Sequence, residues 1–340
     1  MDPNESTRED GAAAAGSSDT AGERRERTAL DALTDGIESV VLGQPDLVRQ
    51  LTITLLAGGH ALIEGVPGTA KTLAVRALAR ALDLRFGRVQ FTPDLMPTDL
   101  LGVNVLDQRT ATFEFRPGPV FTDVLLADEI NRAPAKTQAA LLEAMQERQV
   151  TVDGETRRMS PTFTVLATQN PVEFEGTYPL PEAQLDRFLL NIRVGYPGEE
   201  SEAAILDRYV DGFDAERTET FPESARVGAA SIEELKREVG AVHVEPPVRR
   251  YITRIVRATR EHPTFSLGAS PRAGVALFLA TRAGAVLAGR DFSTPDDVKA
   301  LTLPVLRHRV VLTPEAEVEG RGADEWLLDV LQSVEAPRDR

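Results

Sequence analysis

Gly65-Val66-Pro67-Gly68-Thr69-Ala70-Lys71-Thr72 is the stretch of sequence that decides the fold. It follows a short apolar run at residues 61–64 and opens a segment, residues 71–82, with helical spacing and strong helix formers. In a strand–loop–helix unit of this kind, backbone N–H groups of the loop and of the helix N-terminus bind phosphate. The stretch therefore predicts a phosphate-binding loop, in which Lys71 reaches the β- and γ-phosphates of a nucleotide and the Thr72 hydroxyl ligates Mg²⁺.

The residue before Lys71 departs from the usual pattern of such loops, because it is Ala70 rather than glycine. A methyl group is tolerated at this position where the backbone has a negative φ. We therefore expect Ala70 to have a negative φ and to sit at the entrance of the helix. The alternative interpretation of the loop taken alone is an ordinary strand–turn–helix corner.

A second apolar run, at residues 124–127, ends in Asp128 and Glu129. A strand that is buried on both faces and carries acids at its carboxyl end suits a parallel sheet, whose ligand lies beyond the strand ends. Asp128 is expected to hold Mg²⁺, directly or through water, and Glu129 to accept the proton of the attacking water or to orient it. A solvated acidic turn is the alternative, and the presence of the loop weakens it.

A third apolar run, at residues 165–168, leads to Asn170. We expect this strand to lie beside the acidic strand, so that Asn170 hydrogen-bonds the attacking water or the γ-phosphate. An asparagine in the turn before Pro171 is the plain alternative.

The chain divides into three parts by composition and periodicity. Residues 1–28 are small, polar and charged, and they predict a disordered tail. Residues 29–198 alternate strand and helix patterns, as in an α/β layered core, and two hairpins interrupt them at 103–115 and 149–159. Residues 199–340 predict a helical domain beside the core. Its helices are expected at residues 199–211, 231–239, 248–261, 271–289 and 295–310.

Two arginines stand at unusual places in this layout. Arg187 precedes an apolar strand at residues 189–194, and Arg272 lies at the start of a helix in the second domain. An arginine at a helix start is unfavourable for the helix dipole, so its placement is easier to explain if the guanidinium meets phosphate. A surface arginine is the ordinary alternative for each of the two.

Composition narrows the class of protein. The formal net charge of −15 argues against a general affinity for nucleic acid. The sequence has no cysteine, so disulfides and thiolate metal sites are excluded. No apolar run is long enough for a membrane span, and the N-terminus lacks a signal-peptide pattern, so we expect a cytoplasmic protein. Arginine far outnumbers lysine, which a salt-adapted cytoplasm and a GC-rich genome explain equally well.

Four blocks of sequence, in this order, resemble the MoxR-type AAA+ ATPases. They are GVPGTAKT, LLADEINRAPAKTQAALLEAMQERQVTVDGET, ATQNPVEFEGTYPLPEAQLDRF and GASPRA. The resemblance covers about residues 29–313, and alanine at the position of Ala70 is usual in that family. It implies an AAA+ P-loop core, with a three-layer αβα parallel sheet, followed by a small all-helical lid domain.

The resemblance also implies a role for each candidate residue, in a site that holds ATP and Mg²⁺. These roles are Walker A for Lys71 and Thr72, Walker B for Asp128 and Glu129, sensor 1 for Asn170, arginine finger for Arg187, sensor 2 for Arg272, and adenine contact for Gly43 and Gln44.

Partners follow from the same resemblance. Such proteins typically form rings, commonly hexamers, and are thought to act as chaperones of a protein client, often with a partner that carries a von Willebrand factor A domain. A motor on nucleic acid, or a subunit of a chelatase-like metal-insertion complex, is the first alternative. The first predicted hairpin carries Arg109 at its turn, and the second carries acids as well as arginines. This mixed charge suits a protein client better than the phosphate backbone of a nucleic acid. A non-enzymatic scaffold is the second alternative, and the intact Lys71, Asp128 and Glu129 argue against it.

Overall fold

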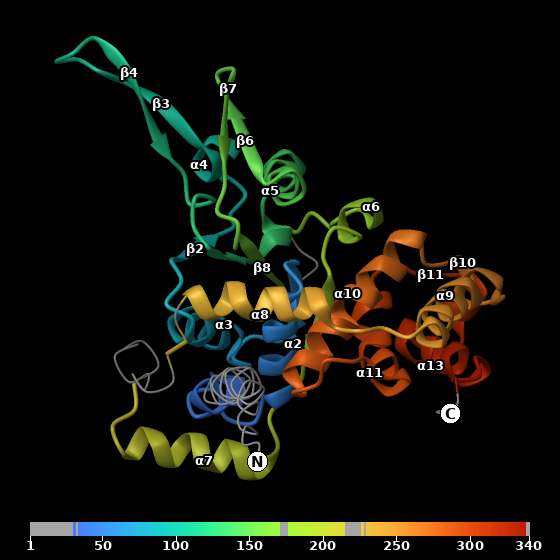
Figure 1. Ribbon diagram of the computed structural model, residues 1–340. Coiled ribbons are helices and arrows are strands. Elements are labelled where there is room, and N and C mark those ends of the chain that lie inside the picture. Colours follow the sequence, from blue (N-terminus) through green and yellow to red (C-terminus); the bar gives the residue numbers. More distant parts are fainter. Residues whose placement is uncertain (1–29, 32, 171–175, 215–225, 228, 338–340) are drawn as a thin grey trace, which may run out of the picture.

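The computed structural model describes residues 30–31, 33–170, 176–214, 226–227 and 229–337 (Figure 1). The predicted tail at residues 1–28 lies outside these residues. Within the described part of the chain, no helix is both long and apolar enough to cross a lipid bilayer.

A five-stranded parallel sheet forms the centre of the molecule (Figure 1). Its strand order is β2-β5-β8-β1-β9, and every neighbouring pair is parallel. The carboxyl ends of all five strands therefore meet at one edge of the sheet, where a ligand is expected. The strands are β1 (Ala61–Gly65), β2 (Phe86–Gln90), β5 (Val124–Asp128), β8 (Thr164–Gln169) and β9 (Leu190–Val194).

Alternating side chains of the central strands enter two separate hydrophobic cores. Ile63, Leu126 and Leu166 pack with α2 (Pro45–Leu56) and α3 (Lys71–Ala81) on one face of the sheet. Their chain neighbours Leu62, Leu125 and Val165 pack with α5 (Ala135–Glu147) on the other face. Because side chains alternate along a strand, continuous apolar runs are what a sheet covered on both sides requires. The αβα layering predicted from the sequence is confirmed.

Two hairpins project from this core in the same direction (Figure 1). One pairs β3 (Gly102–Asp107) with β4 (Thr112–Pro117), and the other pairs β6 (Gln149–Val152) with β7 (Glu155–Arg158). They touch each other, since Asn104 donates a hydrogen bond to Asp153 at 2.7 Å and the Arg157 guanidinium lies 4.0 Å from the ring centre of Phe115. Both hairpins were predicted from turn residues between alternating runs.

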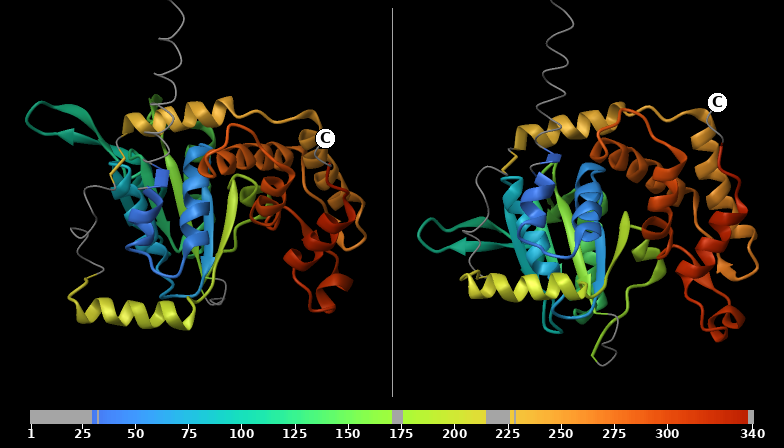
Figure 2. Two further views of the ribbon diagram at one scale, coloured as in Figure 1. Left: turned by 60° about the horizontal axis from the view of Figure 1, so that its bottom comes forward. Right: turned by 90° about the horizontal axis from the view of Figure 1, so that it is seen from below.

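The second half of the chain is helical, as predicted. Its main core is continuous with the core on the α2 side of the sheet. The helix α7 follows the sheet directly and lies at one end of the molecule, whereas α9 to α13 lie at the other end (Figure 2). The remaining elements are α4 (Pro97–Leu101), η1 (Ile130–Arg132), α6 (Glu182–Leu185), α7 (Glu199–Val210), α8 (Ala229–Ala241), α9 (Pro246–Glu261), β10 (Phe265–Leu267), α10 (Pro271–Leu287), α11 (Pro295–Leu306), β11 (Val311–Leu312), α12 (Pro314–Val318) and α13 (Ala323–Ser333).

The start of α11 is held by a buried carboxylate. Asp297 accepts a hydrogen bond from the backbone N–H of Thr294 at 2.8 Å and bonds from Arg290 at 2.8 and 2.5 Å, and Thr294 caps the helix in return. Burial acts to raise the pKa of Asp297, but the bonds from Arg290 and Thr294 outweigh it and hold the pKa below its ordinary value. The ionised form therefore stabilises the fold.

We expect Asp297→Asn to lower the free energy of unfolding by about 2 kcal/mol at pH 7, because it removes the buried negative charge that pairs with the Arg290 guanidinium. A folded-state pKa below the unfolded one stabilises the fold above the unfolded pKa of about 3.9, and this contribution is lost as pH falls through the folded value. The difference between wild type and variant should therefore shrink below pH 4 in urea unfolding curves. Asp296→Asn, at an exposed neighbour, is the matched control, and equal losses in the two variants would contradict the assignment.

Candidate nucleotide-binding site

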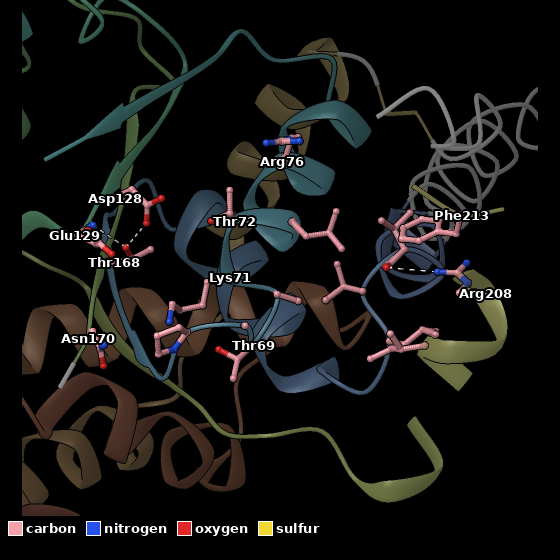
Figure 3. Close-up of a pocket in the computed structure, with 18 of the residues that line it drawn as sticks. Thr69, Lys71, Thr72, Arg76, Asp128, Glu129, Thr168, Asn170, Arg208 and Phe213 are labelled. Atoms are coloured by element: carbon pink, nitrogen blue, oxygen red, sulfur yellow. Dashed lines mark hydrogen bonds between the residues drawn. The ribbon is translucent and has the colours of Figure 1, made fainter. Parts of the chain in front are cut away.

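A cavity of about 510 Å³ lies at the carboxyl edge of the sheet (Figure 3). Its volume is within the usual range for a pocket that holds a small molecule. Lys71, Asp128, Glu129 and Asn170 lie toward one end of it, and Arg208 lies toward the other. Residues predicted from three separate stretches of sequence are thus brought together in one cavity.

The phosphate-binding loop has two residues in left-handed conformations. Gly68 has φ +84°, and Ala70, the N-cap of α3, has φ 59° and ψ 17°. The predicted position of Ala70 at the helix entrance is confirmed, but its predicted negative φ is wrong. A left-handed alanine costs roughly 1–2 kcal/mol. The methyl group packs against the main hydrophobic core, which offsets part of that cost, and a turn of this kind aims backbone N–H groups into one concave surface.

Lys71 is folded back over this loop. Its ammonium group donates to the carbonyl oxygens of Gly65 at 2.5 Å and Val66 at 2.8 Å. Burial lowers the pKa of Lys71 from its ordinary value, and the carboxylates of Asp128 and Glu129 act in the opposite direction. The N-terminus of α3 has no side-chain cap, so its first N–H groups are left for an anion in the cavity.

Thr168 joins the two acids to the neighbouring strand. Its hydroxyl donates to Asp128 Oδ1 at 2.6 Å and accepts the backbone N–H of Glu129 at 2.9 Å (Figure 3). The second oxygen of Asp128 accepts two bonds from Arg88 of β2, at 2.7 and 3.2 Å. Both carboxylate oxygens of Asp128 therefore have protein donors.

Glu129 leaves the strand in a left-handed conformation, with φ 56°. Its side chain accepts a hydrogen bond from Gln90 at 2.7 Å and pairs with Arg132 at 3.1 Å. Asp128 and Glu129 thus have different partners, although they are adjacent in sequence. This separation suits two different roles for the two carboxylates.

The donor set fits a nucleotide with Mg²⁺ better than a metal held by protein alone. Thr72 and Asp128 both line the cavity and offer the oxygen atoms that Mg²⁺ prefers. Among the described residues, no group of three metal-ligating side chains occurs. Mg²⁺ commonly binds through one or two carboxylates together with phosphates and water, so a phosphate ligand is needed to complete the site.

The far end of the cavity is apolar and aromatic. Val40, Val41 and Leu42 line it together with Tyr209 and Phe213. The two aromatic rings meet edge to face with centres 5.8 Å apart. An apolar, aromatic slot of this type suits the flat face of a nucleobase.

Gly43 and Gln44, the predicted adenine contacts, lie just beyond this lining. Gln44 donates a hydrogen bond to the carbonyl oxygen of Gly195 at 2.9 Å. Gly43 has φ +73° and lies so close to Ser201 that a Cβ there would come within 2.6 Å of the Ser201 Cβ. The two residues hold the entry segment against the start of α7, and the residues before them face the cavity.

Arg187 and Arg272 lie together, but neither lines this cavity. They border a second pocket of about 230 Å³, with Arg148 and Asp186. Arg272 Nε lies 3.9 Å from Asp186 Oδ2, a carboxylate that also accepts a bond from the buried Arg309 at 2.7 Å. Arg187 and Arg272, both predicted to contact phosphate, therefore lie beside each other, in a pocket separate from the cavity that Lys71 lines.

Several cavity residues were missed from the sequence. Thr168 could have been found, since it ends a predicted strand beside Asn170. The sequence around Arg88 and Gln90 has no motif that would indicate a role in the site, because their contacts with Asp128 and Glu129 depend on β2 pairing with β5. Arg208 belongs to α7, which we assigned to the helical region.

Known proteins share both the sequence and the fold. Residues 60–190 match the model of the ATPase family associated with various cellular activities (AAA), and residues 257–329 match the AAA lid domain. YeaC of Bacillus subtilis, named an uncharacterized protein, is 45% identical over 311 residues, which are 92% of this chain and 96% of YeaC.

A second relative and one solved structure carry more informative names. Chaperone MoxR1 of Mycobacterium tuberculosis is 43% identical over 312 residues, covering 89% of this chain and 81% of MoxR1. The crystal structure of a putative ATPase from Cytophaga hutchinsonii is similar with a TM-score of 0.85 and 39% identity, covering 94% of this chain and 98% of that one. With the loop, the acids and the sheet order described above, these similarities show that the chain belongs to the MoxR-type AAA+ ATPases and that its reaction is ATP hydrolysis.

Proposed function

We propose that the protein is a Mg²⁺-dependent ATPase that works as a ring and that remodels a protein client. The observation that carries the proposal is the separation of Arg187 and Arg272 from the cavity of Lys71. Both arginines lie outside the cavity of their own chain. The corresponding arginines of a neighbouring copy would complete that cavity. A hexamer is the expected ring.

The residues of the cavity have complementary tasks in hydrolysis. Thr72 and Asp128 would hold Mg²⁺, which when bound would supply positive charge to neutralise the phosphates. Lys71 binds the β- and γ-phosphates, Asn170 orients the attacking water, and Glu129 accepts its proton. An isolated subunit lacks the arginine pair and should hydrolyse ATP slowly.

The neighbour's arginines act on the charge that develops in the transition state. As water attacks, negative charge spreads over the oxygens of the transferred phosphoryl group. Arg187 and Arg272 of the adjoining subunit would stabilise that charge, and arginine fingers contribute roughly 10³–10⁵ in rate in GTPases. Release of the phosphate then removes the group that holds the two subunits in register, so hydrolysis is linked to movement.

The hairpins are the proposed point of contact with the client. Leu106 and Phe113 form a cross-strand pair near the end of the first hairpin, and they are 48% and 73% exposed. Arg109 at its turn lies near Asp107 rather than standing alone. An apolar pair with balanced charge favours a polypeptide over a phosphate backbone, and one relative is named a chaperone. A cytoplasmic location and a partner with a von Willebrand factor A domain belong to the same proposal.

The ring is tested by ATP hydrolysis as a function of protein concentration. We expect the specific activity of the wild type to rise with concentration, and that of Arg187→Ala and Arg272→Ala to fall by about 10³-fold while nucleotide binding persists. Mixing Arg187→Ala with Glu129→Gln should restore activity, because the second variant supplies Arg187 to an intact cavity of the first. Activity that is independent of concentration, with no restoration on mixing, would mean that one chain holds a complete site.

Arg88 provides a second test, directed at the metal site. Its ion pair with Asp128 is partly exposed and is worth up to about 1 kcal/mol. We expect Arg88→Ala to lower the Mg²⁺ concentration needed for half-maximal binding of a fluorescent ATP analogue by about two- to fivefold, because Arg88 competes for the same oxygen. Arg85→Ala, which breaks the pair with Asp123 at the opposite end of the same two strands, is the matched control and should change nothing. A higher Mg²⁺ requirement would show that Arg88 instead positions the carboxylate.

A further inference from the structure

The outer face of α7 carries an apolar stripe with acids beside it. Leu206 is 69% exposed and Val210, one turn later, is 87% exposed. Adjacent large aliphatic side chains at this exposure differ from the single apolar residues scattered over ordinary surfaces. Glu202 and Asp207 flank them, and neither forms an ion pair with any residue that the structure describes.

A groove of about 400 Å³ between α9 and α10 is apolar and lined by arginines, and so is complementary to the apolar, acidic face of α7. Val256, Val275 and Phe278 line its apolar part, and Val275 is 57% exposed. Arg249 and Arg257 line its margin. The helix α9 has five arginines and one glutamate, in a chain whose net charge is −15. The groove therefore suits an acidic helix with an apolar stripe.

These two surfaces lie at opposite ends of the molecule (Figure 2). A patch and its complement on opposite sides generate a head-to-tail contact, which repeats from copy to copy and closes into a ring where the rotation permits. A two-fold symmetric contact would instead pair a patch with itself, and like charges on α7 or on α9 oppose that.

We propose that α7 of one subunit docks into the α9–α10 groove of the next subunit. Leu206 and Val210 would pack against Val275 and Phe278, and the acids of α7 would face the arginines of α9. The inference rests on the proposed ring and assigns its contact surface. It names a second copy of this chain as the occupant of the groove.

The docking also has a consequence for the nucleotide. The inner face of α7 lines the cavity through Ile205, Arg208 and Tyr209, and Arg272 begins the helix α10 that borders the groove. Seating α7 on the neighbour therefore brings that neighbour's Arg272 toward the cavity that α7 covers. Nucleotide binding and subunit contact are joined through one helix.

Engineered cysteines give a direct test, because the native chain has none. We expect Val210→Cys/Val275→Cys, oxidised with a non-hydrolysable ATP analogue, to give a ladder of covalent oligomers on non-reducing gels. The single variants Val210→Cys and Val275→Cys are the controls and should stay uncrosslinked, because a head-to-tail contact does not bring like positions together. Crosslinking of either single variant would overturn the proposed pairing.

Charge reversal gives an independent test by sedimentation. We expect Arg249→Glu/Arg257→Glu to raise the concentration for half-assembly by about tenfold, and Glu202→Arg/Asp207→Arg to do the same. Combining all four changes should restore assembly to near the wild-type value. Nucleotide binding by the dilute variants serves as the control for folding.

These experiments distinguish a failure of the α7 docking from a failure of the ring itself. If the wild type assembles but the reversals and the cysteine pair have no effect, the ring stands and the docking of α7 is wrong. If the wild type stays monomeric with the analogue at all concentrations, the proposed ring fails and the docking fails with it.

Discussion

The hydroxyl of Thr168 is the contact on which the geometry of the site depends. It is 1% exposed and joins the ends of two adjacent strands, because it donates to the side chain of Asp128 and accepts from the backbone of Glu129. The parallel register that pairs Ala127 with Ala167 places it there. A shift of one residue would turn Thr168 to the other face of the sheet and leave both bonds unmade.

With that contact in place, Asp128 and Glu129 point in different directions and meet different partners. Glu129 turns out of the strand with a positive φ and reaches Gln90, while Asp128 stays in line with β5 and meets Arg88. Both partners belong to β2, at the edge of the sheet. The acids are thus restrained between a buried hydroxyl on β8 and polar side chains on β2, and the cavity is shaped before any ligand binds. Of these contacts, the one from Thr168 can persist when Mg²⁺ takes the place of Arg88, and a group held in this way contributes to catalysis because it needs little rearrangement during the reaction.

The sequence predicted those features that depend on short stretches of chain. Lys71, Thr72, Asp128 and Asn170 were found because each follows an apolar strand, and parallel strands deliver their carboxyl ends to one edge. The conformation of Ala70 was predicted wrongly, because steric preference for a single residue was weighed without the turn that the whole loop makes. Contacts between segments far apart in the chain, such as those from β2 to Asp128 and Glu129, leave no periodic pattern in the sequence from which they could be predicted.

The entry segment and α7 show the same limit. Gly43 and Gln44 stay predicted adenine contacts, and the structure adds that Val40 to Leu42 line the cavity and that Gln44 is bonded to Gly195. The role of Arg208 depends on α7 lying across that segment, where Arg208 donates to the carbonyl oxygen of Val40 at 3.4 Å. Periodicity identifies α7 as a helix, but it does not say which part of the fold the helix covers.

The distribution of charge explains how an acidic chain can still associate with itself. A net charge of −15 makes identical subunits repel one another. At physiological salt this repulsion is screened over about 8 Å, so contacts at shorter range decide the outcome. The arginines of α9 and the acids of α7 would make the local interaction attractive where α7 of one copy meets α9 of the next, and repulsive where α7 meets α7 or α9 meets α9. The overall charge therefore opposes nonspecific association, and the local pattern permits a contact between opposite ends of the molecule.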